Sequence, residues 1–195
     1  LVDATVKLYR EVCDNFLPTP LKCHYLFNLR DVAKVAQGFL SLSKQHGESA
    51  ERVQRLWVHE VYRVFGDRLV TKADLSNYRE VVNTTLGSSL GASWDGLMSA
   101  LEPQYQDIGP LWVNFLADPP VMQEVVEREK AKAKLEEELE NYNIEPGFIP
   151  MELVLFGDAV QHVSRICRIL RQPRGNLMLV GMGGSGRQSL ARLSA

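Results

Sequence analysis

The residues with the clearest potential for chemistry form a glycine-rich loop close to the C-terminal end of the sequence. The loop consists of Gly181, Met182, Gly183, Gly184, Ser185, Gly186, Arg187, Gln188 and Ser189. It follows a short apolar run, 177–180, and residues with helical character resume at Leu190. A strand, a glycine loop and a helix in this order are the context of a phosphate-binding loop, because the loop amides and the helix N-terminus both attract an anion. We therefore expect a phosphate group to bind at this loop.

The loop departs at two positions from the pattern G-x-x-x-x-G-K-[ST], which it otherwise fits from Gly181 to Gly186. Arg187 stands where lysine is expected, and Gln188 stands where serine or threonine is expected. Arginine keeps the charge and can pair with phosphate oxygens in a fork, although its side chain is longer and planar. Gln188 has no hydroxyl group for Mg²⁺, so Ser189, one place late, is the candidate ligand. We expect ATP or ADP to bind here, with Mg²⁺ binding left open and hydrolysis slow or absent.

A second cation stands out near the start of a predicted helix. Asn28 is expected to cap a helix that carries apolar residues on one side from Leu29 onward. Arg30 therefore falls in the first helical turn, where a cation is mildly unfavourable for the helix dipole. Two interpretations of Arg30 stay open from the residues alone. It is an ordinary surface arginine, or it reaches an anion outside the helical domain.

The composition excludes several classes of protein. The sequence has 195 residues with 45% hydrophobic and 24% charged content, which fits one large domain or two small ones. The net charge of −2 gives no global field for nucleic acid or an anionic membrane. No apolar run approaches the roughly 20 residues that span a bilayer. The chain does not begin with Met, and we expect it to be an excised fragment.

The cysteines and histidines indicate neither a disulfide framework nor a metal site. The residues concerned are Cys13, Cys23, Cys167, His24, His46 and His59. The cysteines are scattered and odd in number, so we expect buried or half-buried thiols in a reducing compartment. The histidines lie apart without metal-ligand spacing and are interpreted as structural residues.

Helical periodicity predicts the elements that come before the loop. Residues 1–17 are expected to form the end of a helix from an upstream domain, and Gly47 is expected to break the chain. Helices are then predicted after Asn28, over about 49–65, and after Thr71, whose spacing to Asp74 is that of a capping box. Amphipathic helices joined by short turns are typical of a small helical bundle.

The middle of the chain is less regular. Residues 92–120 are rich in turn residues, and the aromatic residues dispersed through them are expected to pack on a neighbouring surface. A stacking platform for single-stranded nucleic acid is disfavoured, because basic residues are not interleaved with these aromatics. Residues 121–142 read as a charged helix with a thin apolar stripe, which favours a solvated helix on a body over a coiled coil. The expected stripe consists of Val121, Val125, Leu135, Leu139 and Tyr142.

The last part of the chain reads as the opening of an α/β domain. Residues 151–156 are apolar, a helix with Arg165, Arg168 and Arg171 on its polar face follows, and a turn leads into a strand at 177–180. A single strand cannot satisfy its own edges, so the flanking sheet is expected beyond Ala195. We predict a mainly α fold, with a helical bundle followed by the helix, first strand and phosphate loop of a truncated α/β P-loop domain. The predicted divisions are 1–21, 22–91, 92–150 and 151–195.

A helical bundle followed by a phosphate loop fits the boundary between two tandem modules of the AAA+ type, in which a helical lid ends each module. Three stretches carry a closer resemblance: 24–31, 56–69, and 169–176 followed by 183–189. They resemble dynein heavy chains, and axonemal ones most of all. The resemblance covers nearly the whole chain and is weakest over 92–150. It places the lid of the third module, at 22–91, before the start of the fourth.

This resemblance implies a ring of six modules that drives a microtubule motor, with its main hydrolytic site in another module. Arg30 matches the lid arginine called sensor 2, which points at the γ-phosphate of the nucleotide in its own module. Val154, Leu155 and Phe156 match the segment that covers the adenine of the next module. The acidic residues that position Mg²⁺ and the attacking water would follow Ala195. The fragment alone is therefore expected to be inactive, whereas its parent would hydrolyse ATP.

The resemblance also implies partners and a location. The neighbouring AAA+ modules of the same chain are expected to contact this part directly. Microtubules and other dynein chains would be bound through parts outside it, and neither nucleic acid nor a membrane is expected as a partner. The location implied is the cytoplasm, the cytoskeleton and the axoneme of a cilium.

Two alternatives from other classes come from the residues themselves. A P-loop enzyme of another kind, such as a kinase or GTPase, is disfavoured because those folds begin at the strand and not at a helical bundle. A helical scaffold or interaction module with an incidental glycine loop stays open, since glycine-rich loops also occur by chance.

Overall fold

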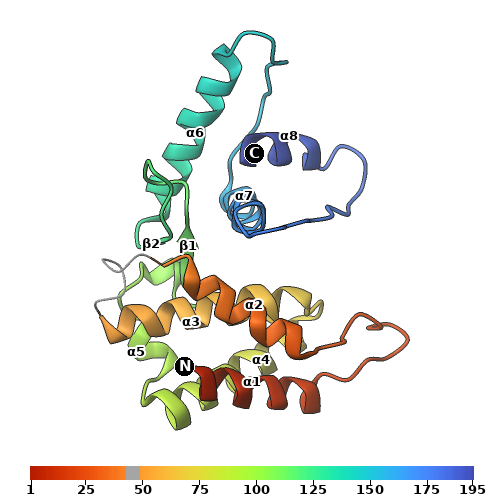
Figure 1. The fold of residues 1–195 in the computed structure, drawn as a ribbon, viewed down its shortest axis with the longest axis vertical. Coiled ribbons are helices and arrows are strands. Elements are labelled where there is room, and N and C mark those ends of the chain that lie inside the picture. The colour runs from red at the N-terminus through yellow and green to blue at the C-terminus, as the bar shows by residue number, and fades with distance from the viewer. Residues whose placement is uncertain (43–48) are drawn as a thin grey trace. The chain divides into compact units, whose positions relative to one another are not determined.

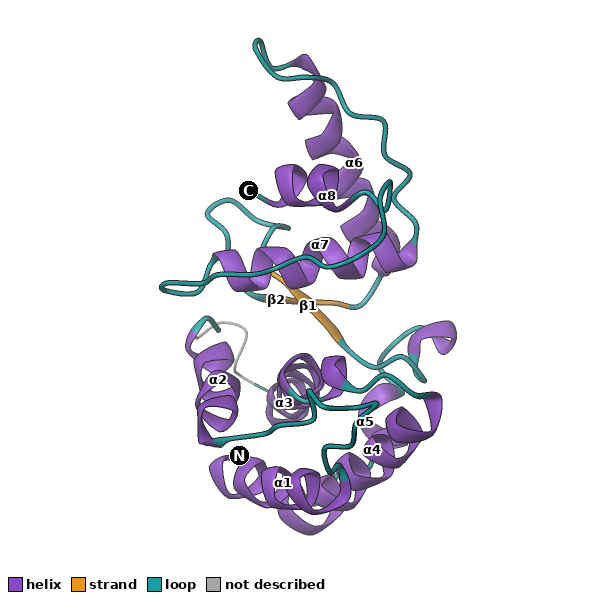
Figure 2. Ribbon diagram, turned by 90° about the vertical axis from the view of Figure 1, so that its right-hand side faces the viewer, coloured by secondary structure: helices purple, strands orange, loops and turns teal. Residues whose placement is uncertain are grey.

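The computed structural model describes residues 1–42 and 49–195 of the chain (Figure 1). The predicted break at Gly47 and the histidine His46 lie outside the described residues. The chain divides into two compact units, Leu1–Leu111 and Trp112–Ala195, and each is considered by itself. Helices make up most of the ordered structure in both units, which confirms the predicted mainly α fold (Figure 2). None of the described helices combines the length and the apolar character needed to cross a bilayer.

The first unit is a helical bundle. Its helices are α1 (Val2–Asn15), α2 (Leu29–Leu40), α3 (Ala50–Val64), α4 (Lys72–Thr85) and α5 (Trp94–Met98). Short helical turns η2 (Gly66–Arg68), η3 (Leu86–Leu90) and η4 (Pro103–Tyr105) connect or follow them. Helix α1 packs along α4, and α2 packs on α3 (Figure 1). Their facing sides share one hydrophobic core, in which Trp57, Tyr78 and Leu8 are completely buried.

Local hydrogen bonds set where the helices begin. The Asn28 side chain accepts a bond from the Arg30 amide at 2.9 Å, and the Asp31 carboxylate accepts one from the Asn28 amide at 3.0 Å. This reciprocal arrangement is a capping box, which satisfies amides that lack partners within the helix. At the start of α4, Thr71 Oγ1 accepts a bond from the Asp74 amide at 3.1 Å. Both predicted helix starts are therefore confirmed.

Helix α1 is part of the same core as the helices after it. Leu8, Val12 and Phe16 lie in the common hydrophobic cluster. The indole of Trp57 on α3 donates a buried hydrogen bond of 2.9 Å to Thr5 Oγ1. The predicted domain boundary between residues 21 and 22 stays a prediction, but α1 packs as a member of the bundle.

The middle of the chain is more ordered than the sequence indicated. Residues predicted as irregular contain α5 and the strand β1 (Leu111–Val113), which pairs with β2 (Gln123–Val125) in a two-stranded sheet. Trp94 and Trp112 are buried, as expected for aromatic residues that pack on a surface. The charged helix α6 (Arg128–Ile144) begins later than the predicted 121. The assignment of Val121 and Val125 to its stripe was therefore wrong, because both residues precede α6 and Val125 belongs to β2.

The second unit is built from α6, α7 (Gly157–Leu170) and α8 (Arg187–Ser194). Helix α6 buries Ala131, Leu135 and Leu139, and α7 packs against both α6 and α8. Ion pairs within α6 join Lys132 to Glu136, and Lys134 to Glu137 and Glu138. A solvated helix lying on a body is thus the better description of α6, as predicted.

Residues 177–180 are extended but do not form the predicted strand. Among the described residues no neighbouring segment forms a ladder with them, and a strand exists only as one member of a hydrogen-bonded pair. Their side chains alternate: Leu177 and Leu179 are partly buried, whereas Met178 and Val180 are 84% and 81% exposed. The segment has the alternating burial of a strand that is covered on one face only.

The cysteines are free thiols, and one differs from the prediction. Cys13 is partly buried and Cys167 is buried, but Cys23 is exposed. Cys23 lies in the turn-rich segment ahead of α2, which presents several of its side chains to solvent.

Candidate phosphate-binding loop and lid arginine

Two glycines of the loop adopt conformations that other residues rarely take. Gly184 and Gly186 have φ angles of +78° and +73°, and Gly186 directly precedes α8. Both angles are strained for a side chain with a Cβ atom. A Cβ added at Gly183, Gly184 or Gly186 would meet no heavy atom within 4 Å, so the backbone here faces open space. An incoming anion could approach these amides closely.

Arg187 is held against the loop by the backbone of the loop itself. Its Nη2 atom donates a hydrogen bond of 3.1 Å to the Met182 carbonyl oxygen. A Cβ at Gly181 would lie 3.1 Å from Ser185 Oγ and 3.4 Å from Arg187 Cδ, so the side chains of Ser185 and Arg187 lie close to the Gly181 backbone. The loop thus combines an exposed glycine backbone with a guanidinium group directly beside it. These residues fit a phosphate group in both shape and charge.

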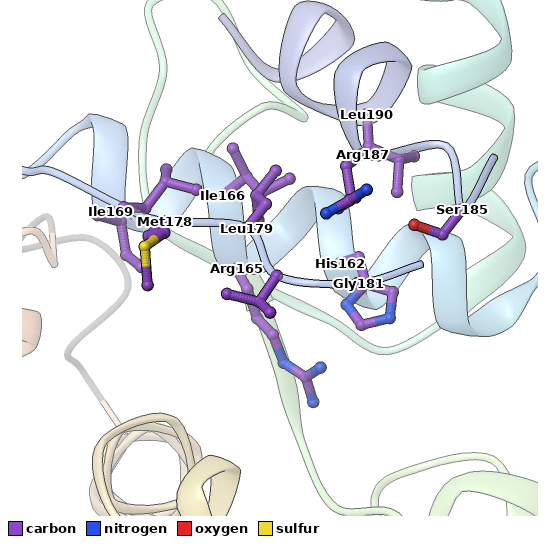
Figure 3. A pocket seen from close by; sticks show the side chains of 12 residues that line it. His162, Arg165, Ile166, Ile169, Met178, Leu179, Gly181, Ser185, Arg187 and Leu190 are labelled. Atoms are coloured by element: carbon purple, nitrogen blue, oxygen red, sulfur yellow. The ribbon is translucent and has the colours of Figure 1, made fainter. Parts of the chain in front are cut away.

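A cavity of about 320 Å³ lies between α7, the extended segment and the loop (Figure 3). Its apolar lining includes Ile166, Ile169 and Leu190, and the polar lining from the loop comes from Ser185 and Arg187. Helix α7 adds two further polar side chains, His162 and Arg165. His162 was not predicted from the sequence as a site residue. Its position four residues before Ile166, and therefore on the same side of α7, is the signal that could have found it.

The other predicted residues of this region lie in varied surroundings. Leu155 is buried, whereas Val154 and Phe156 are 82% and 60% exposed. None of the three lines the cavity beside the loop, so their predicted place next to an adenine ring stays a prediction. Ser189 is partly buried on the first turns of α8, and Gln188 is exposed.

Arg30 lies in the first unit, at the start of α2. It is exposed, and a shallow hollow lined by Tyr9, Phe27, Asn28 and Leu29 adjoins it. Among residues 1–42 and 49–195 its guanidinium group has no hydrogen-bond or ion-pair partner. The geometry therefore leaves this cation available to an external anion.

The next residue, Asp31, is buried and has several hydrogen-bond partners. It is 1% exposed and accepts hydrogen bonds from Arg68 Nη1 at 3.1 Å and Nη2 at 2.5 Å. Burial by itself would raise the pKa of the Asp31 carboxyl, but bonds from Arg68 and the Asn28 amide outweigh it and leave the pKa below its ordinary value. Asp31 is thus a buried carboxylate in a two-pronged ion pair. This pair was not predicted from the sequence.

A second carboxylate fastens the segment that leads to α2. Asp74 Oδ2 accepts bonds from Lys22 Nζ at 2.6 Å and from the Tyr25 hydroxyl at 2.8 Å. The Tyr25 hydroxyl in turn accepts a bond from the Val70 amide at 3.0 Å. The pKa of Asp74 is lowered to about 2, mainly by the hydrogen bond from the Lys22 ammonium group and secondly by the one from Thr71.

Comparison with protein families identifies both parts of the chain. Residues 1–99 match the AAA+ lid domain, and residues 151–195 match the P-loop containing dynein motor region D4. The second match indicates a nucleotide-binding type of domain.

Individual relatives give the same result over the whole length. The chain is 43% identical over 195 residues to dynein axonemal heavy chain 2 of Homo sapiens, covering 100% of this chain and 4% of that one. It is 46% identical over 195 residues to the dynein-1-beta heavy chain of the flagellar inner arm I1 complex of Chlamydomonas reinhardtii, covering 98% and 4%. Dynein axonemal heavy chain 3 of Homo sapiens is 41% identical over 202 residues, covering 100% and 5%.

The chain therefore spans only a small part of the length of these relatives. Within that part, the lid match comes first and the D4 match follows, in the order expected for the end of one module and the start of the next. The chain belongs to the axonemal dynein heavy chains, and it carries a match to an AAA+ lid domain followed by a match to the dynein motor region D4.

Proposed function

We propose that the chain is part of the ATP-driven AAA+ ring of a dynein that moves along microtubules in cilia or flagella. Its first part would be the lid of the third module, and 151–195 would open the fourth. The neighbouring modules of the same heavy chain are its direct partners in this proposal. Contacts with microtubules and other dynein chains belong to parts outside it, and the axoneme is the location that its relatives suggest.

Within that ring, the loop at 181–189 binds ATP or ADP in a regulatory role. The observation that carries this proposal is the open glycine backbone at Gly183, Gly184 and Gly186, which lies directly before α8 and beside the Arg187 guanidinium. The loop amides and the N-terminus of α8 would hold the phosphates. Arg187 would exchange its bond to the Met182 carbonyl for a phosphate oxygen.

Hydrolysis at this loop is proposed to be slow or absent. Phosphoryl transfer depends on accurate placement of charge around the γ-phosphate. Arg187 supplies the charge through a planar group in place of a compact ammonium. A Mg²⁺ ion would add further charge neutralisation when bound, and Ser189 is the hydroxyl proposed to hold it, since Gln188 has none.

Two other parts of the chain complete the proposal. Arg30 would reach the γ-phosphate of the nucleotide in the third module, which gives a reason for a cation at the start of α2 that has no side-chain partner in the described part of the chain. Val154, Leu155 and Phe156 would cover the adenine ring of the fourth. The exposure of Val154 and Phe156 supports this role, because it leaves apolar surface that a base could cover.

Replacement of Arg187 by alanine in the full-length heavy chain tests the phosphate-loop proposal. We expect nucleotide occupancy of the fourth module to fall about tenfold or more, because a charge-assisted contact is lost. Arg192→Ala is the matched control, since Arg192 lies on the same helix and is exposed. The readout is bound nucleotide, measured with a fluorescent ATP analogue while the other phosphate loops are disabled.

The two possible failures of this experiment have different meanings. Unchanged occupancy in Arg187→Ala would contradict the proposed contact between Arg187 and the phosphates. If the unaltered fourth module binds no nucleotide, the alternative of a helical scaffold with an incidental glycine loop is favoured instead.

A further inference from the structure

Two arginines near the start of α2 differ in whether their guanidinium groups have partners in the protein. Arg30 is exposed and has no side-chain partner among the described residues. Arg68, from the turn η2, has both terminal nitrogens bound to Asp31, and its Nη1 also donates to the Leu26 carbonyl oxygen at 3.0 Å. One cation is therefore available to a ligand, while its neighbour is fully engaged in the protein.

We infer that the pair of half-buried Arg68 and buried Asp31 is a positioning device for Arg30 and fixes the direction in which the Arg30 guanidinium group leaves α2. This inference rests on the proposed role of Arg30 toward a nucleotide phosphate. Arg68 and Asp31 touch no ligand in it and act only through Arg30.

The bonds of Asp31 fix the rotation of the first turn of α2. Its carboxylate accepts from Arg68, from the Asn28 amide at 3.0 Å, and from Lys34 Nζ at 3.3 Å. Successive residues of an α-helix are about 100° apart around the axis. Because Asp31 is held inward at 1% exposure, Arg30 is directed toward the outside.

Arg68 also holds the chain on the other side of Arg30. Its guanidinium carbon lies 5.4 Å from the centre of the Phe27 ring, and its carbonyl oxygen lies 2.9 Å from His24 Nε2. Phe27 lines the hollow that adjoins Arg30. Arg68 therefore contacts the segment before α2, the Phe27 ring that lines the hollow, and the helix turn that carries Arg30.

Stability alone is a weak explanation for this arrangement. The Arg68 side chain is 28% exposed, and an ion pair that is taken partly out of water often stabilises a fold no better than apolar residues of similar size, although it can specify one geometry. The bundle core is centred on other residues, among them Trp57 and Tyr78, which are completely buried. A positioning role and a purely structural role make different predictions, which a double-mutant cycle separates.

The experiment measures ATP and ADP affinities of the third module in the full-length heavy chain, with the other phosphate loops disabled. The variants are Arg30→Ala, Arg68→Gln and the double variant, read with fluorescent ATP and ADP analogues. We expect each single change to lower the preference for ATP over ADP by about tenfold, because a contact to the γ-phosphate is lost or misplaced. The double variant should lose no more than Arg30→Ala alone.

Arg79→Gln is the matched control. Arg79 also pairs with an aspartate, Asp107 at 2.9 Å, and lies 4.8 Å from the centre of an aromatic ring, Trp94, but it is remote in sequence from α2. It should leave the ATP preference unchanged. Asp31→Asn, which keeps the size of the side chain, should reproduce the effect of Arg68→Gln and guards against a variant that fails to fold. Amide exchange of α3 in each variant reports whether the bundle is intact.

The outcomes distinguish the proposed role of Arg30 toward a nucleotide from the positioning role of Arg68 and Asp31. A further loss in the double variant beyond Arg30→Ala, or a normal ATP preference in Arg68→Gln and Asp31→Asn, would overturn the positioning role and leave the role of Arg30 standing. If Arg30→Ala itself keeps the normal ATP preference, the proposed role of Arg30 is wrong, and the positioning role fails with it.

Discussion

The two candidate phosphate-binding arginines differ in the hydrogen bonds that their side chains make within the chain. Arg187 is bound to a carbonyl oxygen of its own loop, whereas Arg30 is held only through its backbone and through its neighbour Asp31. The first arginine must give up a bond to reach a phosphate, and the second need not. We therefore expect Arg30 to respond to the presence of a γ-phosphate more directly than Arg187 does.

The Asp74 carboxylate predicts how the bundle responds to acid. Its pKa of about 2 in the folded chain lies below the roughly 3.9 of an unfolded aspartate, chiefly because Lys22 binds the charged form. A lowered pKa contributes stability that is present above about pH 4 and is lost as the pH falls toward about 2. Asp74→Asn should therefore weaken the bundle at pH 6 but lose less further stability between pH 4 and pH 2.

Urea unfolding at a series of pH values, followed by circular dichroism, measures this change. Asp95→Asn is a suitable control, because Asp95 is an exposed carboxylate of α5 in the same unit. An identical acid response in the Asp74→Asn variant and the unaltered chain would mean that the contacts of Lys22 and Tyr25 with Asp74 do not stabilise the folded state.

The ion pair between Asp31 and Arg68 could not be predicted, because its two residues lie far apart in the sequence. Asn28 was predicted to cap the apolar residues that follow it, so a helix start was visible from a few consecutive residues. The partner of Asp31 is Arg68, 37 positions later, and no local pattern connects them. Arg30 was recognised as a candidate because its charge is unfavourable where it stands, which is local information. The residue that braces it could be found only in the folded chain.

Helices α2 and α4 were predictable because the residues that specify them lie within or next to each helix. Strands β1 and β2 were not predicted. The periodic apolar residues and the caps of α2 and α4 lie within the helices themselves. The strands β1 and β2 have three residues each, and such short segments are stabilised by pairing with each other. The helical pattern proposed from 121 onward extended across β2 for the same reason, since charge alone does not mark where a helix begins.

Helix α1 offers a prediction at the level of elements. Leu8 is completely buried in the shared core, so Leu8→Ala should lower the free energy of unfolding of the bundle by about 2–5 kcal/mol. Leu17→Ala is the control, because Leu17 lies just after α1 and is 62% exposed. It should change the stability by less than about 0.5 kcal/mol. Thermal and urea unfolding of both variants give the two values, and equal small effects would show that α1 is not needed by the bundle.

The complete chain contains a helical bundle with a buried core and, at residues 177–180, a segment that exposes apolar side chains on one face. Met178 and Val180 expose most of their surface, while Leu177 and Leu179 face the protein. Such exposed apolar surface usually marks a place where further structure packs. The relatives of this chain are many times longer, so the heavy chain has ample sequence from which to cover this face.

Amide exchange tests this difference between the chain and the full-length protein. In the chain by itself, the amides of 177–180 should exchange quickly, because they form no strand ladder among the described residues, whereas the centre of α7 around Val163 should be protected. In the full-length heavy chain we expect 177–180 to become as protected as α7, since parallel strands on both sides would satisfy their backbone groups. Strong protection of 177–180 in the isolated chain would contradict the first expectation. Rapid exchange in the full-length protein would mean that these residues do not become the strand that presents the phosphate loop, and the loop would then lack the rigid support that nucleotide binding requires.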